Sequence, residues 1–166
     1  MNSKKKNLIF ILVFFIGLIL LERIGLYQNT NINIDNISIK KPFGYRYSSV
    51  PIEDKYTKTT FLYNYLGLIS SFKLQNSKAL ILNFKSITGN KYLVTFRTSK
   101  HEERTFMYYY NENKVNFFNL NQCIYELDNT KDRYNILGLI KNTNISFSLY
   151  GNNNENVQEM LSDICD

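Results

Sequence analysis

An uninterrupted apolar run from Leu8 to Leu21 is the feature that most limits what this chain can fold into. Lys4–Lys6 precedes the run, and Glu22 and Arg23 follow it. No polar side chain interrupts the run, so a helix formed by it has no polar side to turn toward water. Such a helix does not suit the surface of a small soluble domain. The sequence therefore predicts a membrane-targeting segment.

Two kinds of targeting segment share this pattern. A cleaved signal peptide needs a basic start, an apolar stretch of about 7–15 residues and small residues at the cleavage site. The chain's only alanine is Ala79, and the residues that follow Leu21 offer no suitable pair of small side chains. An uncleaved anchor needs about 20 mostly apolar residues, which the stretch from Leu8 to Tyr27 supplies if Glu22 and Arg23 lie at the exit. We predict a signal anchor at residues 1–27, with a cleaved, secreted protein as the alternative.

The charges around the segment predict its orientation. Leu8, Phe14 and Leu21 mark the beginning, middle and end of the expected anchor. Lys4–Lys6 stands before it and only Arg23 closely follows, so the positive-inside rule keeps the N-terminus in the cytoplasm. No second apolar run of similar length follows. The remainder of the chain is therefore expected on the extracytoplasmic side.

The chain beyond residue 27 is long enough for one domain with a hydrophobic core but not for two. The formal net charge of the whole chain is +6. Four basic residues and one acidic residue belong to the first 27, so the remainder, with 16 basic and 13 acidic side chains, carries +3. Nucleic-acid binding usually shows as a clustered basic stripe, which this dispersed charge does not resemble. We therefore expect a protein partner and no nucleic acid.

Cys123 and Cys165 are the chain's two cysteines, and both follow the membrane segment. In an oxidising compartment two cysteines have a single pairing. The sequence therefore predicts a Cys123–Cys165 disulfide, with two unpaired hydrophobic thiols as the alternative. His101 is the only histidine, so these three side chains supply too few ligands for a zinc site. We expect no metal and no cofactor.

The start of the extracytoplasmic part is ambiguous in the sequence. Ile32/Ile34 and Ile37/Ile39 alternate with polar residues, so residues 28–50 form either a spacer or an edge strand before a domain at 51–166. A helix is expected to begin at Pro51–Asp54, because proline and acidic side chains suit a first helical turn. Its apolar positions recur at helical spacing: Phe61, Leu62, Tyr65, Leu66, Ile69 and Phe72.

The apolar period then changes to two, which is typical of strands. Leu80, Leu82 and Phe84 share one face of a first run, and Tyr92, Val94 and Phe96 share one face of a second. Further runs follow at 104–110, 114–120, 123–127, 135–141 and 145–150. Short turns between the first four runs predict an antiparallel meander, which the later runs extend.

A final helix is expected at 155–164, with Val157, Met160, Leu161 and Ile164 as its buried stripe. Asn152 and Glu155 resemble a capping pair at its start. The extracytoplasmic part is therefore predicted to be α+β: a helix, an antiparallel meander and a C-terminal helix, with both helices covering one face of the sheet.

No motif for catalysis appears in the sequence. His101 lies in a charged segment between two runs, which we interpret as a solvated hairpin tip. Glu102 and Glu103 are adjacent, so in a strand their carboxylates point to opposite faces and do not converge on one substrate. We predict no catalytic residue. An enzyme whose site is assembled from distant residues is retained as an alternative.

The densest aromatic stretch supplies a candidate binding surface. Tyr108 and Tyr110 are expected on the apolar face of their run, which leaves Tyr109 on the opposite face. The basic residues Arg97, Arg104 and Lys114 lie near it in the predicted meander. Tyrosine and arginine dominate many protein interfaces. We therefore predict an interaction patch of Arg97, Arg104, Tyr109 and Lys114.

These features together favour a single-pass, membrane-tethered protein whose small extracytoplasmic domain binds another macromolecule. The anchor-plus-domain plan favours a bacterial inner membrane, with the domain in the periplasm. An envelope-complex subunit and an immunity-type protein that neutralises a periplasmic toxin both fit this plan. The alternatives are a secreted ligand or effector and an enzyme with an unrecognised site.

Overall fold

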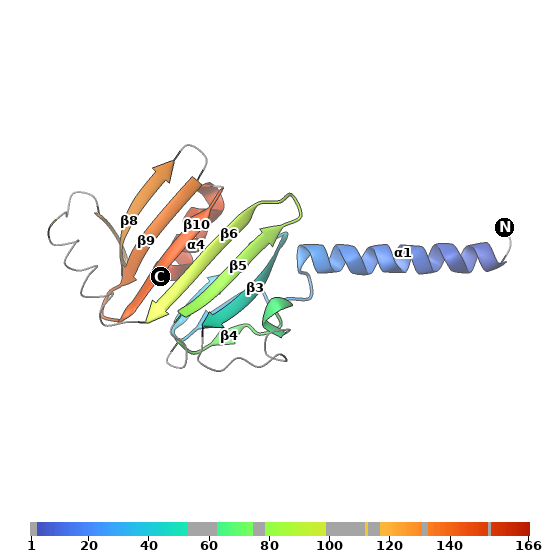
Figure 1. Ribbon diagram of the computed structural model, residues 1–166, viewed down its shortest axis with the longest axis horizontal. Helices are drawn as coiled ribbons and strands as arrows, with labels where there is room; N and C mark the ends of the chain where they lie inside the picture. The colour runs from blue at the N-terminus through green and yellow to red at the C-terminus, as the bar shows by residue number, and fades with distance from the viewer. Residues whose placement is uncertain are drawn as a thin grey trace.

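The computed structural model describes residues 3–52, 63–74, 79–98, 112, 117–130, 133–152 and 154–166. Helix α1, Ser3–Ile24, projects from a body made mainly of strands (Figure 1). The other long helix, α4, spans Asn154–Cys165 at the C-terminal end. The predicted α+β class, with an N-terminal apolar helix and a C-terminal helix, is confirmed.

The main sheet has seven strands in the order β3-β5-β6-β10-β9-β8-β7, and every neighbouring pair is antiparallel. The strands are β3 (Tyr45–Ile52), β5 (Ala79–Ser86), β6 (Lys91–Thr98), β7 (Phe117–Leu120), β8 (Cys123–Thr130), β9 (Arg133–Ile140) and β10 (Ile145–Gly151). Alternating side chains give this sheet one apolar face and one mixed face.

A second sheet has three strands in the order β2-β1-β4: β1 (Asn31–Ile34), β2 (Ile37–Lys40) and β4 (Ser71–Phe72). β1 and β2 form a hairpin, and β4 runs parallel to β1. The alternating residues Ile32/Ile34 and Ile37/Ile39 lie on β1 and β2, and β1 is the central strand of this small sheet. Ile32, Ile34 and Ile39 are completely buried, so this hairpin belongs to the hydrophobic core.

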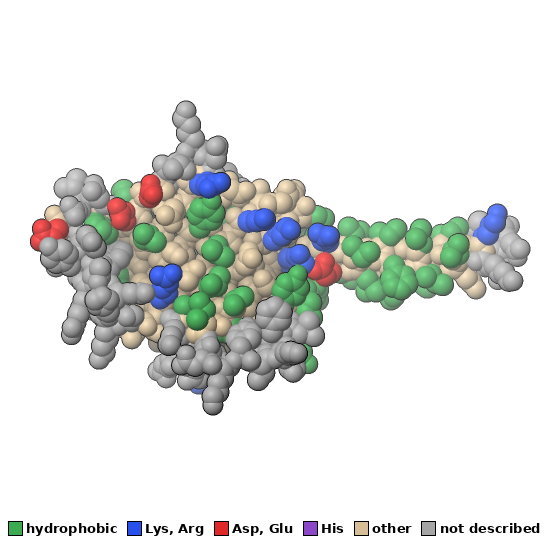
Figure 2. Space-filling model, in the orientation of Figure 1, with side chains coloured by type: hydrophobic (Ala, Val, Ile, Leu, Met, Phe, Trp, Pro, Cys, Tyr) green, Lys and Arg blue, Asp and Glu red, His purple; other side chains and the backbone are tan. Residues whose placement is uncertain are grey.

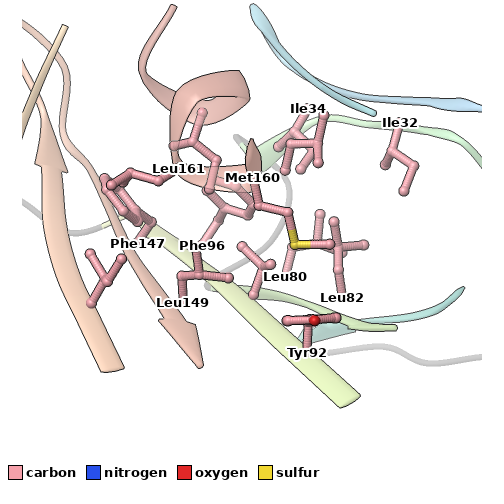
Figure 3. Packing of buried hydrophobic residues seen from close by; sticks show 14 of the residues in the cluster. Ile32, Ile34, Leu80, Leu82, Tyr92, Phe96, Phe147, Leu149, Met160 and Leu161 are labelled. Carbon is pink, nitrogen blue, oxygen red and sulfur yellow. The ribbon is translucent and has the colours of Figure 1, made fainter. Parts of the chain in front are cut away.

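The core lies between the main sheet on one side and α4 with the small sheet on the other (Figure 3). One row of it follows the register across four strands, with Leu82 opposite Val94, and Leu149 opposite both Val94 and Ile136. The predicted stripe of α4 is buried, as expected: Val157, Met160, Leu161 and Ile164. The face of the sheet that packs on α4 is called the inner face below, and the opposite face the outer face.

The prediction that a helix starts at Pro51–Asp54 is wrong at Pro51, which belongs to a strand. Pro51 and Ile52 are the last residues of β3, where Pro51 lies opposite Leu80. β3 is an edge strand, and proline is tolerated there because its missing N–H removes no ladder bond at a free edge. Of the later positions assigned to this helix, Tyr65 is helical whereas Phe72 belongs to β4.

The predicted meander is correct for its first hairpin and wrong in its continuation. β5 and β6 pair with the expected residues buried, but the second neighbour of β6 is β10. β7 lies at the far edge of the sheet and pairs with β8. The third predicted run, 104–110, lies outside the described residues. The hairpins β7-β8, β8-β9 and β9-β10 therefore return the chain to β6.

Candidate functional site

Of the predicted interaction patch, the described residues include Arg97 alone. Arg97 lies near the end of β6 on the outer face, and its side chain is exposed. Arg104, Tyr109 and Lys114 lie outside the described residues, as does His101. The convergence of these side chains therefore remains a prediction.

The outer face of the main sheet carries exposed apolar side chains (Figure 2). Leu93 and Tyr150 are opposite one another on β6 and β10, and they are 38% and 39% exposed. Five members of this group are named the outer apolar patch: Val50, Ile52, Leu93, Leu137 and Tyr150. No described helix or strand covers it. Exposed apolar groups that gather on one face often mark an interaction surface.

A row of three cations crosses the outer face at the end nearest α1. Arg46 on β3 lies opposite Lys85 on β5, and Lys85 lies opposite Lys91 on β6. Figure 2 shows Lys and Arg side chains gathered over the sheet beside the base of the helix. Among the described residues, Arg46 pairs with Glu22, whereas Lys85 and Lys91 form no ion pair. The row therefore keeps excess positive charge.

The end of α1 is joined to the domain without a linker. Glu22 forms an ion pair with Arg46. Four residues after α1, Gln28 is 6% exposed and its amide Nε2 donates to the carbonyl oxygens of Tyr47, at 2.8 Å, and Leu66, at 2.6 Å. The N–H of Tyr47 donates to Gln28 Oε1 at 2.8 Å. One buried side chain thus connects the end of the helix to β3 and to the segment before β4.

Two glycines make room for this amide. Gly25 has φ 62°, and a Cβ there would lie 2.8 Å from both Arg46 Cα and Gln28 Oε1. Gly67 has φ 67°, and a Cβ there would overlap the Gln28 amide and the Tyr47 carbonyl. Positive φ and close backbone approach both favour glycine. The joint therefore depends on these two positions.

A cavity of about 260 Å³ lies at this junction, on the side of the cation row. Its lining combines charged, amide and aromatic side chains: Glu22, Tyr27, Gln28, Arg46, Tyr47, Ser48, Tyr65, Leu66, Asn83, Lys85 and Lys91. Three cations and one carboxylate leave the lining positive. An anionic group is the ligand that such a lining favours.

Buried tyrosines lie on the core side of the same end of the sheet. The hydroxyl of Tyr45 donates to that of Tyr92 at 3.2 Å, and the Asn156 amide donates to both, at 3.3 Å and 3.0 Å. Burial, and then the Tyr45 hydrogen bond, raise the pKa of Tyr92. Burial raises the pKa of Tyr47 to about 12. The hydroxyls of Tyr47 and Tyr92 therefore stay protonated at neutral pH and act as structural groups.

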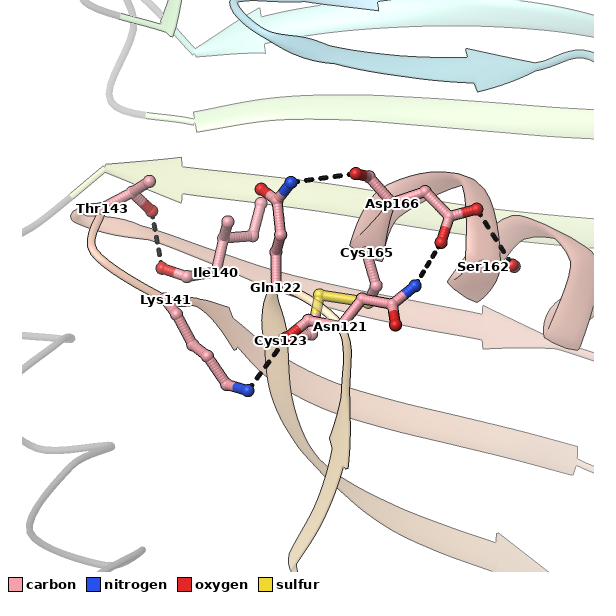
Figure 4. Close-up of a disulfide and its surroundings, with 9 residues drawn as sticks. All are labelled: Asn121, Gln122, Cys123, Ile140, Lys141, Thr143, Ser162, Cys165 and Asp166. Atoms are coloured by element: carbon pink, nitrogen blue, oxygen red, sulfur yellow. Dashed lines mark hydrogen bonds between the residues drawn. A yellow bond between two sulfur atoms is a disulfide. The ribbon is translucent and has the colours of Figure 1, made fainter.

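Cys123 on β8 and Cys165 at the end of α4 form a disulfide (Figure 4), with their Cα atoms 5.3 Å apart. Both are completely buried. Nearby, the Gln122 N–H donates to the Cys165 carbonyl at 3.0 Å, and the Asn121 amide donates to the Asp166 carboxylate. The bridge attaches the C-terminal helix to the first residue of β8, directly after the turn between β7 and β8.

α1 has the length and composition of a membrane span. A window of 20 residues, Lys5–Ile24, has a mean hydropathy of 2.3, and none of it is buried against the domain. Leu8, Phe14 and Leu21 are 69%, 56% and 45% exposed. Such a large exposed apolar surface is unfavourable in water. A signal sequence has the same properties, so the helix by itself does not fix its orientation or its retention.

No family model, curated protein or solved structure matches this chain. Within the part of the chain that the structure describes, no three histidine, cysteine, aspartate or glutamate side chains gather as metal ligands would. The strongest candidate sites are therefore the outer apolar patch and the cation row beside α1. The cation row has no signal in the sequence, because each of its residues only occupies the polar side of its own strand until the strand pairing is known.

Proposed function

We propose that this protein is a single-pass membrane-anchored binding protein that presents the outer face of its sheet to a protein partner. The observation that carries the proposal is the exposure of the outer apolar patch. Its five side chains are 38–46% exposed and come from four strands of one sheet. A rigid sheet holds such groups in place before binding, which lowers the entropy lost on association.

The surroundings of the patch indicate the chemistry of the partner. Arg46, Lys85 and Lys91 lie at one end of the outer face, and Arg97 lies toward the other. Protein interfaces commonly have an apolar or aromatic centre with a charged rim. We therefore propose a partner surface with an apolar centre and carboxylates at its border. An envelope-complex subunit or an immunity-type protein would make such a contact.

We place the domain on the extracytoplasmic side, as a subunit of a bacterial inner-membrane assembly that faces the periplasm. Lys4–Lys6 at the start of α1 supports this orientation through the positive-inside rule. The Cys123–Cys165 disulfide supports it as well, because disulfides persist in oxidising compartments and are rare in the cytosol.

Site-specific photo-crosslinking tests the binding surface. A photoreactive amino acid is placed at Leu93 or Tyr150 on the outer face, and at Glu159 as a control, since Glu159 is exposed on α4 away from that face. In the native membrane, the two outer-face positions should give the same discrete adduct, and the α4 position should not. Equal crosslinking from α4 and the outer face would reject this surface as the binding site.

The crosslinked partner then allows an affinity measurement. Leu93→Ser should weaken binding at least about 30-fold if Leu93 is a central contact worth about 2 kcal/mol. Its matched control is Ser148→Ala, which removes a hydroxyl from the same face. Unchanged affinity for Leu93→Ser, with the fold intact, would contradict the proposal.

Membrane extraction distinguishes the anchored form from the secreted alternative. The proposed protein stays in the membrane after an alkaline carbonate wash and keeps Met1 or Asn2 as its N-terminus. A mature protein that is released and begins near residue 28 would instead support a cleaved signal peptide and a secreted ligand or effector.

A further inference from the structure

We propose that the end of the domain nearest α1 makes a second, specific contact with the bilayer, by inserting Phe43 and Ile87 and by binding anionic lipid headgroups through Lys85 and Lys91. This inference rests on the membrane-spanning role of α1 in the proposed function. It does not require a protein partner. The ligand proposed for Lys85 and Lys91 is the phosphate of an anionic glycerophospholipid in the leaflet where α1 leaves the membrane.

The domain begins close to the surface of the bilayer. The 20 residues of Lys5–Ile24 form a helix of about 30 Å, which matches the hydrocarbon thickness of about 30 Å. Ile24 therefore lies at the membrane surface. Gln28 is already buried in the domain, only four residues later. Three residues between these positions leave no room for a spacer, so the domain begins within the headgroup region.

Two exposed apolar side chains, Phe43 and Ile87, lie near the base of α1. Gly25 lies against the backbone of Tyr45 and Arg46, and Tyr45 lies opposite Ser86. Phe43 and Ile87 are therefore next to residues at the base of α1. Figure 1 shows the turn between β5 and β6 on the same side of the body as the helix. Phe43 is 94% exposed and Ile87 is 56% exposed.

Positively charged side chains lie beside Phe43 and Ile87. Lys85 precedes the β5-β6 turn and Lys91 follows it, with Ile87 between them. Arg46 and the junction cavity of about 260 Å³ lie beside Lys85. Apolar tips flanked by cations are typical of interfacial membrane contacts, where the cations meet phosphates and the apolar groups enter the acyl boundary. A fully exposed phenylalanine side chain in bulk water buries no apolar area and therefore adds nothing to the stability of the domain.

α1 and the neighbouring contact through Phe43 and Ile87 together fix the tilt of the domain on the bilayer. The outer apolar patch then faces sideways, along the membrane, instead of toward it. A partner embedded in or tethered to the same membrane would meet it in a fixed orientation.

Fluorescence quenching measures the insertion directly, because the chain contains no tryptophan. The full chain carrying Phe43→Trp is reconstituted into vesicles of phosphatidylglycerol and phosphatidylcholine that contain brominated acyl chains. The matched control is Phe118→Trp, at the far edge of the sheet from α1, where the native side chain is 50% exposed. Flotation of the vesicles first establishes that the chain is inserted.

The expected result is strong quenching for Phe43→Trp and little for Phe118→Trp. Quenching that is equal for the two positions would overturn the insertion of Phe43. A chain that fails to float with the vesicles would instead overturn the anchor, and with it the membrane part of the proposed function. Neither result depends on the outer-face crosslinking experiment, so the two proposals fail separately.

The headgroup part is tested in the Phe43→Trp background. Replacing both Lys85 and Lys91 by glutamine should lower the ratio of bilayer-docked to undocked domains roughly 25-fold in phosphatidylglycerol vesicles. This corresponds to a loss of roughly fivefold for each lysine. The control removes two exposed charges elsewhere, with Lys73→Gln and Arg133→Gln. Equal quenching in pure phosphatidylcholine vesicles, or equal effects of the two pairs of substitutions, would overturn anionic headgroup binding.

Discussion

The side-chain amide of Gln28 and the backbone of Tyr47 form two hydrogen bonds, each 2.8 Å long, that join the end of α1 to the edge strand of the sheet. The same amide also donates to the Leu66 carbonyl. A buried glutamine whose amide is paired on both sides holds the end of α1 in one orientation against the sheet. This relationship makes the junction a defined structural element instead of a flexible tether.

Gln28→Ala should destabilise the domain by about 2–4 kcal/mol, because it leaves buried backbone groups of Tyr47 and Leu66 without their partner. The measurement is a urea unfolding curve of the full chain in detergent, followed by near-ultraviolet circular dichroism. Asn29→Ala is the control: its amide donates to the Ser70 hydroxyl in an exposed pair, so a change within about 0.5 kcal/mol is expected. Similar losses for both variants would disprove the special role of Gln28.

The stability of the domain should fall as the pH rises from about 10 toward 12. Burial raises the pKa of Tyr47 to about 12 from its ordinary value of 10.0. In that interval the folded state binds more protons than the unfolded state, so unfolding becomes more favourable with pH. Once Tyr47 is fully ionised, the free energy of unfolding should have fallen by about 2–3 kcal/mol.

Unfolding free energies measured at a series of alkaline pH values test the predicted decline in stability. Tyr47→Phe should make the decline shallower, whereas Tyr63→Phe, at a side chain that is 50% exposed, should not change it. A decline of the same slope in wild type and Tyr47→Phe would show that another group causes it.

Gly138→Ala should destabilise the domain by about 1–3 kcal/mol, as overpacking in a core does. Gly138 lies opposite Phe147 in the β9-β10 ladder, and a Cβ at Gly138 would overlap the Phe147 ring. Gly17→Ala serves as the control, because a Cβ there meets nothing within 4 Å. Thermal unfolding of the two variants gives the comparison.

A second substitution identifies the cause. Phe147→Leu should cost less in the Gly138→Ala background than in the wild type, because the smaller side chain relieves the overlap. Additive effects of the two substitutions would show that the ring is not the group that the new methyl meets.

The Cys123–Cys165 bridge closes a segment with a sequence separation of 42 residues. Loop-closure entropy for such a length is worth about 3–4 kcal/mol. Replacing both cysteines by alanine should lower the unfolding free energy by about that amount. A reductant should lower the stability of the wild type and leave the double variant unchanged. Alkylation of both thiols in unfolded, unreduced protein would show that the bridge is absent.

Local sequence patterns determined the elements whose signals lie within a few residues. The apolar run of α1 is uniform over many turns, so its helical, membrane-compatible character needs no tertiary information. The alternation of Leu80, Leu82 and Phe84 similarly predicted the inner face of β5, and the spacing of Val157 and Ile164 predicted the buried side of α4. In each case side-chain period alone decides which groups turn inward.

Only the tertiary structure decided which strands are neighbours. β10 lies beside β6 although about 50 residues separate them in the sequence, and no local pattern encodes such a pairing. The edge position of β3 likewise decided that Pro51 ends a strand instead of starting a helix. The cation row follows for the same reason: Arg46, Lys85 and Lys91 share a surface because β3, β5 and β6 adjoin. Sequence period set the face of each side chain, whereas long-range hydrogen bonding and core packing set its neighbours.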